Sequence, residues 1–166
     1  MRAYQVFGRM RDEEATRVLG VLAEKAPAFH TQALGAAAAA MRARPQFVLR
    51  QTPEKRAAAV RRALARVAAN DVAEELLAVY FLDCRNEVLV EWLELVGLEH
   101  EKGMLKADAP PQPDEAAVAK AVARFREAAK PDGEPGDRAD RELLLRAFAA
   151  QRAVDWPALE QRLDPA

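Results

Sequence analysis

The segment 71–96 carries the strongest helical pattern in the chain. Its apolar residues are spaced four, three, four, four and three residues apart, which places them on one face of a helix. They are Leu77, Phe81, Cys84, Val88, Trp92 and Leu95. The opposite side carries an acidic stripe of Asp83, Glu87, Glu91 and Glu94. The alternative is two shorter helices broken near 84–86, but a break has no evident reason to preserve both faces. We therefore expect one long helix here, at the centre of the core.

Proline positions divide the rest of the chain into further helices. Pro27, Pro45 and Pro53 each interrupt a preceding helical pattern or begin the next one, because proline is tolerated in the first turn but not inside a helix. Between two of them, the short stretch 46–51 carries Phe47, Val48 and Leu49, which we expect to enter the core. Alanine is abundant and aromatic residues make up only 6% of the chain, which favours helices over strands.

These patterns predict an all-α protein, a compact bundle of about six to seven helices. The proline-rich segment 109–113 excludes helix and is the best candidate for a linker. We expect a main bundle over 1–108 and a C-terminal helical subdomain over 114–166 that packs on it. A loop rich in proline and glycine, 131–136, separates the expected C-terminal helices.

The net charge of −1 conceals a reversal between two adjacent segments. From Arg42 to Asn70 the chain has eight basic residues and one acidic residue, a net charge of +7. From Asp71 to Glu101 it has one basic and nine acidic residues, a net charge of −8. Each of these charged regions either neutralises the other within the fold or faces a partner. Because both stripes lie opposite apolar faces of their helices, we expect them on the outside.

The basic segment holds the candidate contacts for a partner protein or for nucleic acid. On a helical wheel Lys55, Arg62 and Arg66 fall close together, opposite the apolar side chains. Arg42, Arg44 and Arg50 precede them, and arginine suits bidentate contacts with phosphates. Against nucleic acid, few aromatic residues are interleaved with these cations.

Catalytic machinery is largely missing from the sequence. Serine is absent, the seven glycines are scattered and form no phosphate-binding loop, and zinc ligands at the usual spacing are missing. The acidic stripe suggests a carboxylate metal site, but such sites in helical bundles also need Glu-x-x-His, which neither His30 nor His100 supplies. We therefore expect no catalytic residues, no metal and no cofactor, and lean against an enzyme.

The lone cysteine, Cys84, fits a reducing compartment, and the N-terminal residues lack the apolar core of a signal peptide. No apolar run is long enough to cross a membrane. We thus expect a cytoplasmic protein without membrane association. The leading hypothesis is a non-catalytic interaction or adaptor module that binds a protein partner or itself. The alternative is a nucleic-acid-binding protein, and the third is a carboxylate-based metal protein or helical enzyme.

Overall fold

The computed structural model describes residues 1–129 and 136–163, so most of the loop expected at 131–136 lies outside the described residues. Within them the chain forms ten α-helices and one two-stranded antiparallel sheet, which confirms the all-α prediction. The α-helices are α1 (Ala3–Arg9), α2 (Asp12–Lys25), α3 (Pro27–Met41), α4 (Pro45–Leu49), α5 (Pro53–Leu64), α6 (Asn70–Val79), α7 (Asn86–Leu95), α8 (Glu115–Glu127), α9 (Asp137–Ala149) and α10 (Pro157–Leu163). The remaining elements are the 3-10 turn η1 (Val67–Ala69), the π-helical segment η2 (Tyr80–Cys84) and strands β1 (His100–Glu101) and β2 (Met104–Leu105).

Helix starts follow the proline and capping signals of the sequence. Pro27, Pro45 and Pro53 occupy the first turns of α3, α4 and α5, where a missing N–H costs nothing. The carboxylate of Asp114 accepts a hydrogen bond from the Ala117 N–H at 2.7 Å and so caps α8. Helix α1 was not among the expected elements, although its buried residues follow helical spacing; they are Ala3, Val6, Phe7 and, just past its end, Met10.

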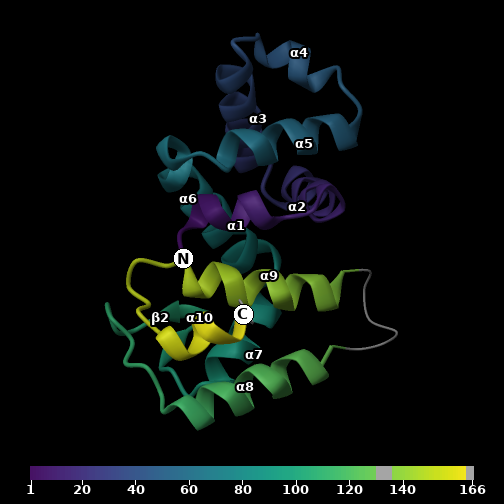
Figure 1. The fold of residues 1–166 in the computed structure, drawn as a ribbon. Coiled ribbons are helices and arrows are strands. Elements are labelled where there is room, and N and C mark those ends of the chain that lie inside the picture. Colours follow the sequence, from purple (N-terminus) through teal and green to yellow (C-terminus); the bar gives the residue numbers. More distant parts are fainter. Residues whose placement is uncertain (130–135, 164–166) are drawn as a thin grey trace. The chain divides into compact units, whose positions relative to one another are not determined.

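Apart from Met1, the chain divides into two compact units at a single point, between Cys84 and Arg85. The N-terminal unit comprises Arg2–Cys84, and the C-terminal unit comprises Arg85–Ala166 together with Met1. In the N-terminal unit α2 packs against α3 and α5, and α1 packs against α5 and α6 (Figure 1). Small and branched residues make up most of the core of this unit. The short helix α4 packs against α3, and a loop leads from it to α5.

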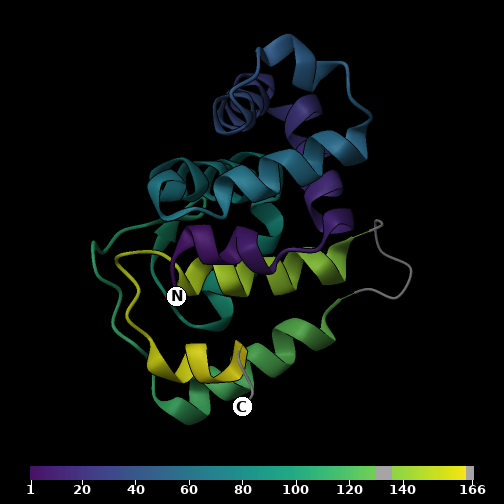
Figure 2. The same ribbon diagram turned by 45° about the horizontal axis from the view of Figure 1, so that its top comes forward.

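The C-terminal unit has an aromatic core. The ring of Trp92 on α7 lies 5.4 Å from that of Phe125 on α8 and 5.8 Å from that of Phe148 on α9, measured between centroids. Trp156, just before α10, meets Phe148 at 5.2 Å, and α10 lies beside α8 (Figure 2). Such pairs add about 0.5–1.5 kcal/mol beyond the burial of their surface. The aromatic cluster therefore ties four segments of this unit together.

The proline-rich segment 109–113 lies inside the C-terminal unit, whereas we expected the division of the chain there. Pro110 is buried, and its carbonyl accepts a hydrogen bond from Trp156 Nε1 at 3.0 Å. The side-chain oxygen of Gln112 accepts another from the Ala158 N–H at 3.3 Å. The segment lacks helix, as expected, but it packs along the start of α10 instead of separating two bodies.

The single helix expected over 71–96 is wrong. The segment forms α6, η2 and α7, with Arg85 outside helical geometry at φ −131° and ψ 43°. A π turn contains more residues than an α turn, so successive side chains are separated by a smaller angle around the helix axis. Tyr80 and Phe81 are thereby both buried, with their rings edge to face at 5.1 Å. The apolar residues of the pattern are buried on both sides of the break, all but the half-buried Leu95.

Candidate interaction surface

Three arginines surround α4 in the N-terminal unit. Arg42 ends α3 in the left-handed conformation at φ 52°, Arg44 precedes α4 in an extended conformation, and Arg50 follows α4 directly. All three are exposed. Among the described residues none of them forms an ion pair. Residues 41–50 contain no acidic residue, so this segment carries a net charge of +3.

The second group of predicted contacts lies along α5 and just beyond it. Lys55 and Arg62 belong to α5 and Arg66 follows it, and all three side chains are exposed, as the helical wheel predicted. Within the described part of the chain they form no ion pair either. By contrast, Arg61 on the same helix binds Asp12, with Nε 2.9 Å from Oδ1. On α5, Arg61 is thus held by a carboxylate, whereas Arg62 faces solvent.

Large apolar side chains are exposed beside the arginines of α4. Phe47 is 55% exposed, Leu49 49% and Met41 43%. They account for three of the five large apolar residues that are exposed in the described part of the chain, and all three lie within nine residues. The expectation that Phe47, Val48 and Leu49 all enter the core is therefore wrong for two of them. On a five-residue helix that packs on one neighbour, only one of three consecutive side chains can face that neighbour, and here it is Val48.

The acidic stripe does not form one functional cluster. Asp83 belongs to η2 in the N-terminal unit, whereas Glu87, Glu91 and Glu94 belong to α7 in the C-terminal unit. Asp83, Glu87 and Glu94 are exposed, and Glu91 is half-buried. No group of three or more potential metal ligands occurs in the part of the chain that the structure describes. The metal alternative thus gains no support from the geometry.

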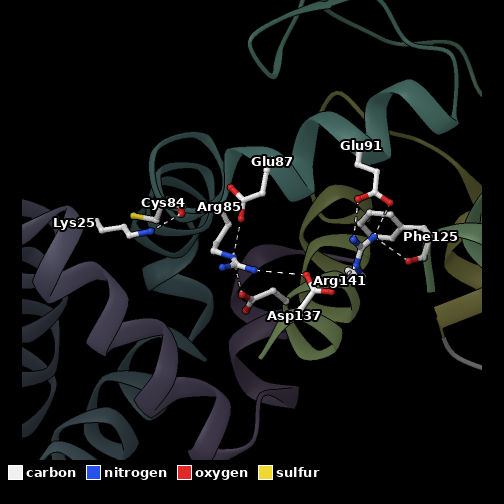
Figure 3. A network of polar contacts seen from close by, with 9 residues as sticks. Lys25, Cys84, Arg85, Glu87, Glu91, Phe125, Asp137 and Arg141 are labelled. Carbon is white, nitrogen blue, oxygen red and sulfur yellow. Dashed lines mark hydrogen bonds and ion pairs between the residues drawn. The ribbon is translucent and has the colours of Figure 1, made fainter. Parts of the chain in front are cut away.

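Glu91 is held by a buried arginine that we did not single out from the sequence. Nη1 and Nη2 of Arg141 donate to the two oxygens of Glu91 at 2.9 and 2.8 Å, and Nε donates to Asp137 at 3.1 Å (Figure 3). Nη1 also donates to the carbonyl of Phe125 at 3.0 Å, and the guanidinium lies 4.8 Å from the centre of the Phe125 ring. The hydrogen bond with Glu91 raises the pKa of Arg141 despite its burial. One side chain therefore links α7, α8 and α9.

Arg85 forms a second buried ionic site at the start of the C-terminal unit. Its Nε lies 2.9 Å from Oδ2 of Asp140 and 3.4 Å from Oε1 of Glu87, and its Nη2 lies 3.7 Å from Oδ1 of Asp137. Figure 3 shows Arg85 turned toward the start of α9. Since every guanidinium and carboxylate here has an ion-pair partner, the arrangement is typical of a structural network that fixes helix neighbours.

A signal for this network was present in the sequence of α9. Asp140 lies four residues before Leu144, and Arg141 lies seven residues before Phe148, so at helical spacing both share a face with these apolar residues. A charged residue at a core position predicts a buried partner of opposite charge, because an unpaired buried charge is costly. The sequence did not indicate which residues these partners are, because Glu91 lies 50 residues before Arg141 and Arg85 lies 55 residues before Asp140.

The remaining reactive side chains are in environments that do not activate them. Cys84 is buried, and this burial raises the pKa of its thiol. The negative charge of Asp83 raises that pKa further, whereas the positive charge of Lys25 lowers it. Lys25 Nζ donates to the Cys84 carbonyl at 3.4 Å and not to the sulfur. Burial, followed by the charge of Arg56, lowers the pKa of His30. His100 Nδ1 accepts a hydrogen bond from the Gly103 N–H at 3.2 Å, which fixes the hairpin between β1 and β2.

Comparison of the chain with protein-family models, curated proteins and solved structures finds no match. In the described residues, no helix combines the length and apolar character required to cross a bilayer. The features that remain for a functional argument are therefore the exposed ones of α3, α4 and α5.

Proposed function

We propose that this chain is a non-catalytic protein interaction module of the cytoplasm, and that its binding surface is the basic, apolar end of the N-terminal unit. We call this surface the α4 patch and define it by Met41, Arg42, Arg44, Phe47, Leu49 and Arg50. The observation that carries the proposal is the exposure of large apolar side chains among arginines that pair with no carboxylate of the described residues. Exposed apolar groups with charged surroundings are a common mark of protein contact sites.

The magnitude of apolar burial supports a reversible contact. Complete burial of one such side chain stabilises a complex by about 1.5–3 kcal/mol, and Met41, Phe47 and Leu49 each have roughly half of this left to gain. Together they supply roughly 3 kcal/mol, to which arginine pairs at the contact would add. Arginine and aromatic residues are also the types most often found among the residues that dominate binding.

A photo-crosslinking experiment tests the proposal. A benzophenone amino acid placed at position 47 keeps an aromatic group on α4, and the matched control carries it at the exposed Ala23 on α2 of the same unit. In native lysate we expect a defined protein adduct from position 47 that disappears when Leu49→Ser is added, and no such adduct from position 23. Equal adducts from both positions, or none from position 47, would contradict the proposal.

Nucleic-acid binding is a second candidate, supported by the exposed cations of α5. Lys55, Arg62 and Arg66 could contact successive phosphates, and such binding weakens steeply as salt increases. The test is a titration with labelled DNA and RNA oligonucleotides at low and at physiological salt. This function requires an affinity that falls with salt and is lost in the variant with Arg62→Glu and Arg66→Glu. Binding that is undetectable at low salt would exclude it.

A further inference from the structure

The α4 helix forms a ridge and not a groove. Successive side chains of a helix are rotated by about 100° around its axis. Phe47 and Leu49 therefore lie on the two flanks of α4, one on each side of the buried Val48. Both flanks are about half exposed. A partner that covers both apolar side chains must therefore reach around α4 and contribute apolar groups of its own.

The charge of the ridge restricts what can cover it. Arg42 and Arg44 lie on the side where the chain enters α4, and Arg50 lies where it leaves, so guanidinium groups flank the apolar residues in sequence on both sides. The described residues supply no carboxylate partner to any of these three side chains. Burying them against a neutral or basic surface would leave arginine charges desolvated and unpaired, which is costly. The partner must therefore be anionic around an apolar centre.

Three anionic partners differ in how they use the apolar residues. Nucleic acid would gain from the arginines and from stacking on Phe47, but Leu49 and Met41 have no role in phosphate contacts or stacking. A membrane would have to hold the protein through three half-exposed side chains, less apolar surface than a single acyl chain, which by itself gives only marginal binding. An acidic protein segment satisfies both components, because carboxylates pair with arginine in bidentate geometry while apolar side chains cover the ridge.

The geometry points to an acidic, amphipathic protein segment as the ligand of the α4 patch. In this segment large apolar residues would recur every three or four positions, so that one helical face meets the ridge, and Asp or Glu would flank them to pair with Arg42, Arg44 and Arg50. This inference rests on the proposed function, since it names the class of partner that the same surface recognises.

Selection from a library of random peptides displayed on phage tests the inference without assuming a sequence. The full chain serves as bait, and the variant with Phe47→Ser and Leu49→Ser serves for counter-selection. We expect the enriched peptides to be rich in Asp and Glu with large apolar residues at helical spacing. A synthetic peptide from this pool should bind in fluorescence anisotropy at least about tenfold more tightly than a scrambled peptide of the same composition.

Matched variants separate the two components of the surface. Leu49→Ser and the pair Arg44→Glu with Arg50→Glu should each weaken the selected peptide at least about tenfold. The controls are Met104→Ser, an exposed apolar residue of β2, and Arg124→Glu, an exposed arginine of α8, and these should leave its affinity unchanged. Circular dichroism checks that each variant is folded.

Several results would overturn the inference. These are a library that yields no peptide dependent on Leu49, enriched peptides that lack acidic residues, and a scrambled peptide that binds as well as the selected one. Tighter binding to phosphatidylglycerol vesicles or to a DNA oligonucleotide would do the same and would identify the other anionic ligand. A protein adduct at position 47 together with any of these results would leave the proposed function standing and reject only the acidic segment.

Discussion

Replacing Arg141 with methionine should strongly destabilise the C-terminal unit. Methionine keeps an unbranched chain of similar reach but removes the hydrogen bonds to Glu91, Asp137 and the Phe125 carbonyl. Arg141 is only 5% exposed, so water cannot replace these partners fully. Breaking a buried ion pair by removing one partner costs about 3–5 kcal/mol. The expected loss is in that range.

The partner Glu91 is about a third exposed, so the effect of changing it must be discounted for solvent. We expect Glu91→Gln to cost about 1 kcal/mol, since the amide still accepts one hydrogen bond and water reaches the rest. In the Glu91→Gln background, Arg141→Met no longer leaves that carboxylate unpaired. Its cost should fall by about 1 kcal/mol, which is the coupling that a double-mutant cycle measures.

Urea unfolding followed by tryptophan fluorescence is the suitable assay. Both tryptophans of the chain, Trp92 and Trp156, belong to the C-terminal unit, so their signal reports on that unit. The control is Arg126→Met, because Arg126 pairs with Glu142 at 2.6 Å but at a much more exposed position, where loss of an ion pair costs at most about 1 kcal/mol. If Arg141→Met cost no more than Arg126→Met, or showed no coupling to Glu91, the reasoning about the buried network would be refuted.

Three further predictions concern single residues. The Cys84 thiol should react with iodoacetamide at pH 8 much more slowly in the folded protein than in guanidinium, because burial raises its pKa and blocks access; equal rates would contradict this. Because the folded pKa of His30 is lowered, the unfolded chain takes up the proton first, and His30 destabilises the fold as the pH falls below about 6.5. His30→Gln should flatten that decline in urea unfolding at pH 5–7, and an unchanged pH profile would refute it. Asp114→Ala should lower the free energy of unfolding by about 1 kcal/mol, more than Thr52→Ala, whose capping contact is longer at 3.4 Å. If urea unfolding showed the larger loss for Thr52→Ala, the length of the capping contact would not determine its contribution to stability.

The helical character of the chain was predictable because it depends on local features. Proline in the first turn, capping by Thr52 and Asp114, and apolar spacing all act within a few residues of each other. The same applies to the exposed cations of α5, which follow from the helical wheel. These properties need no knowledge of distant parts of the chain.

Failures of prediction occurred where distant residues or local backbone adjustments decide the outcome. The apolar residues are buried on both sides of the break after η2, so spacing alone cannot reveal it, and the buried position of Arg85 depends on Asp140, 55 residues later. The exposure of Phe47 and Leu49 depends on which side of a very short helix meets α3. The apolar sequence predicted that all three side chains would be buried. In the structure α4 packs on α3 with Val48 buried, and the other two side chains stay exposed.

The division of the chain at one peptide bond has a consequence for its synthesis. Apart from Met1, each unit is built from consecutive residues, so every residue of the N-terminal unit has been made by the time Cys84 has left the ribosome. Domains generally fold as units, N-terminal first, during translation. The α4 patch, the binding surface that we propose, can therefore fold while the helices that follow Arg85 are still being made.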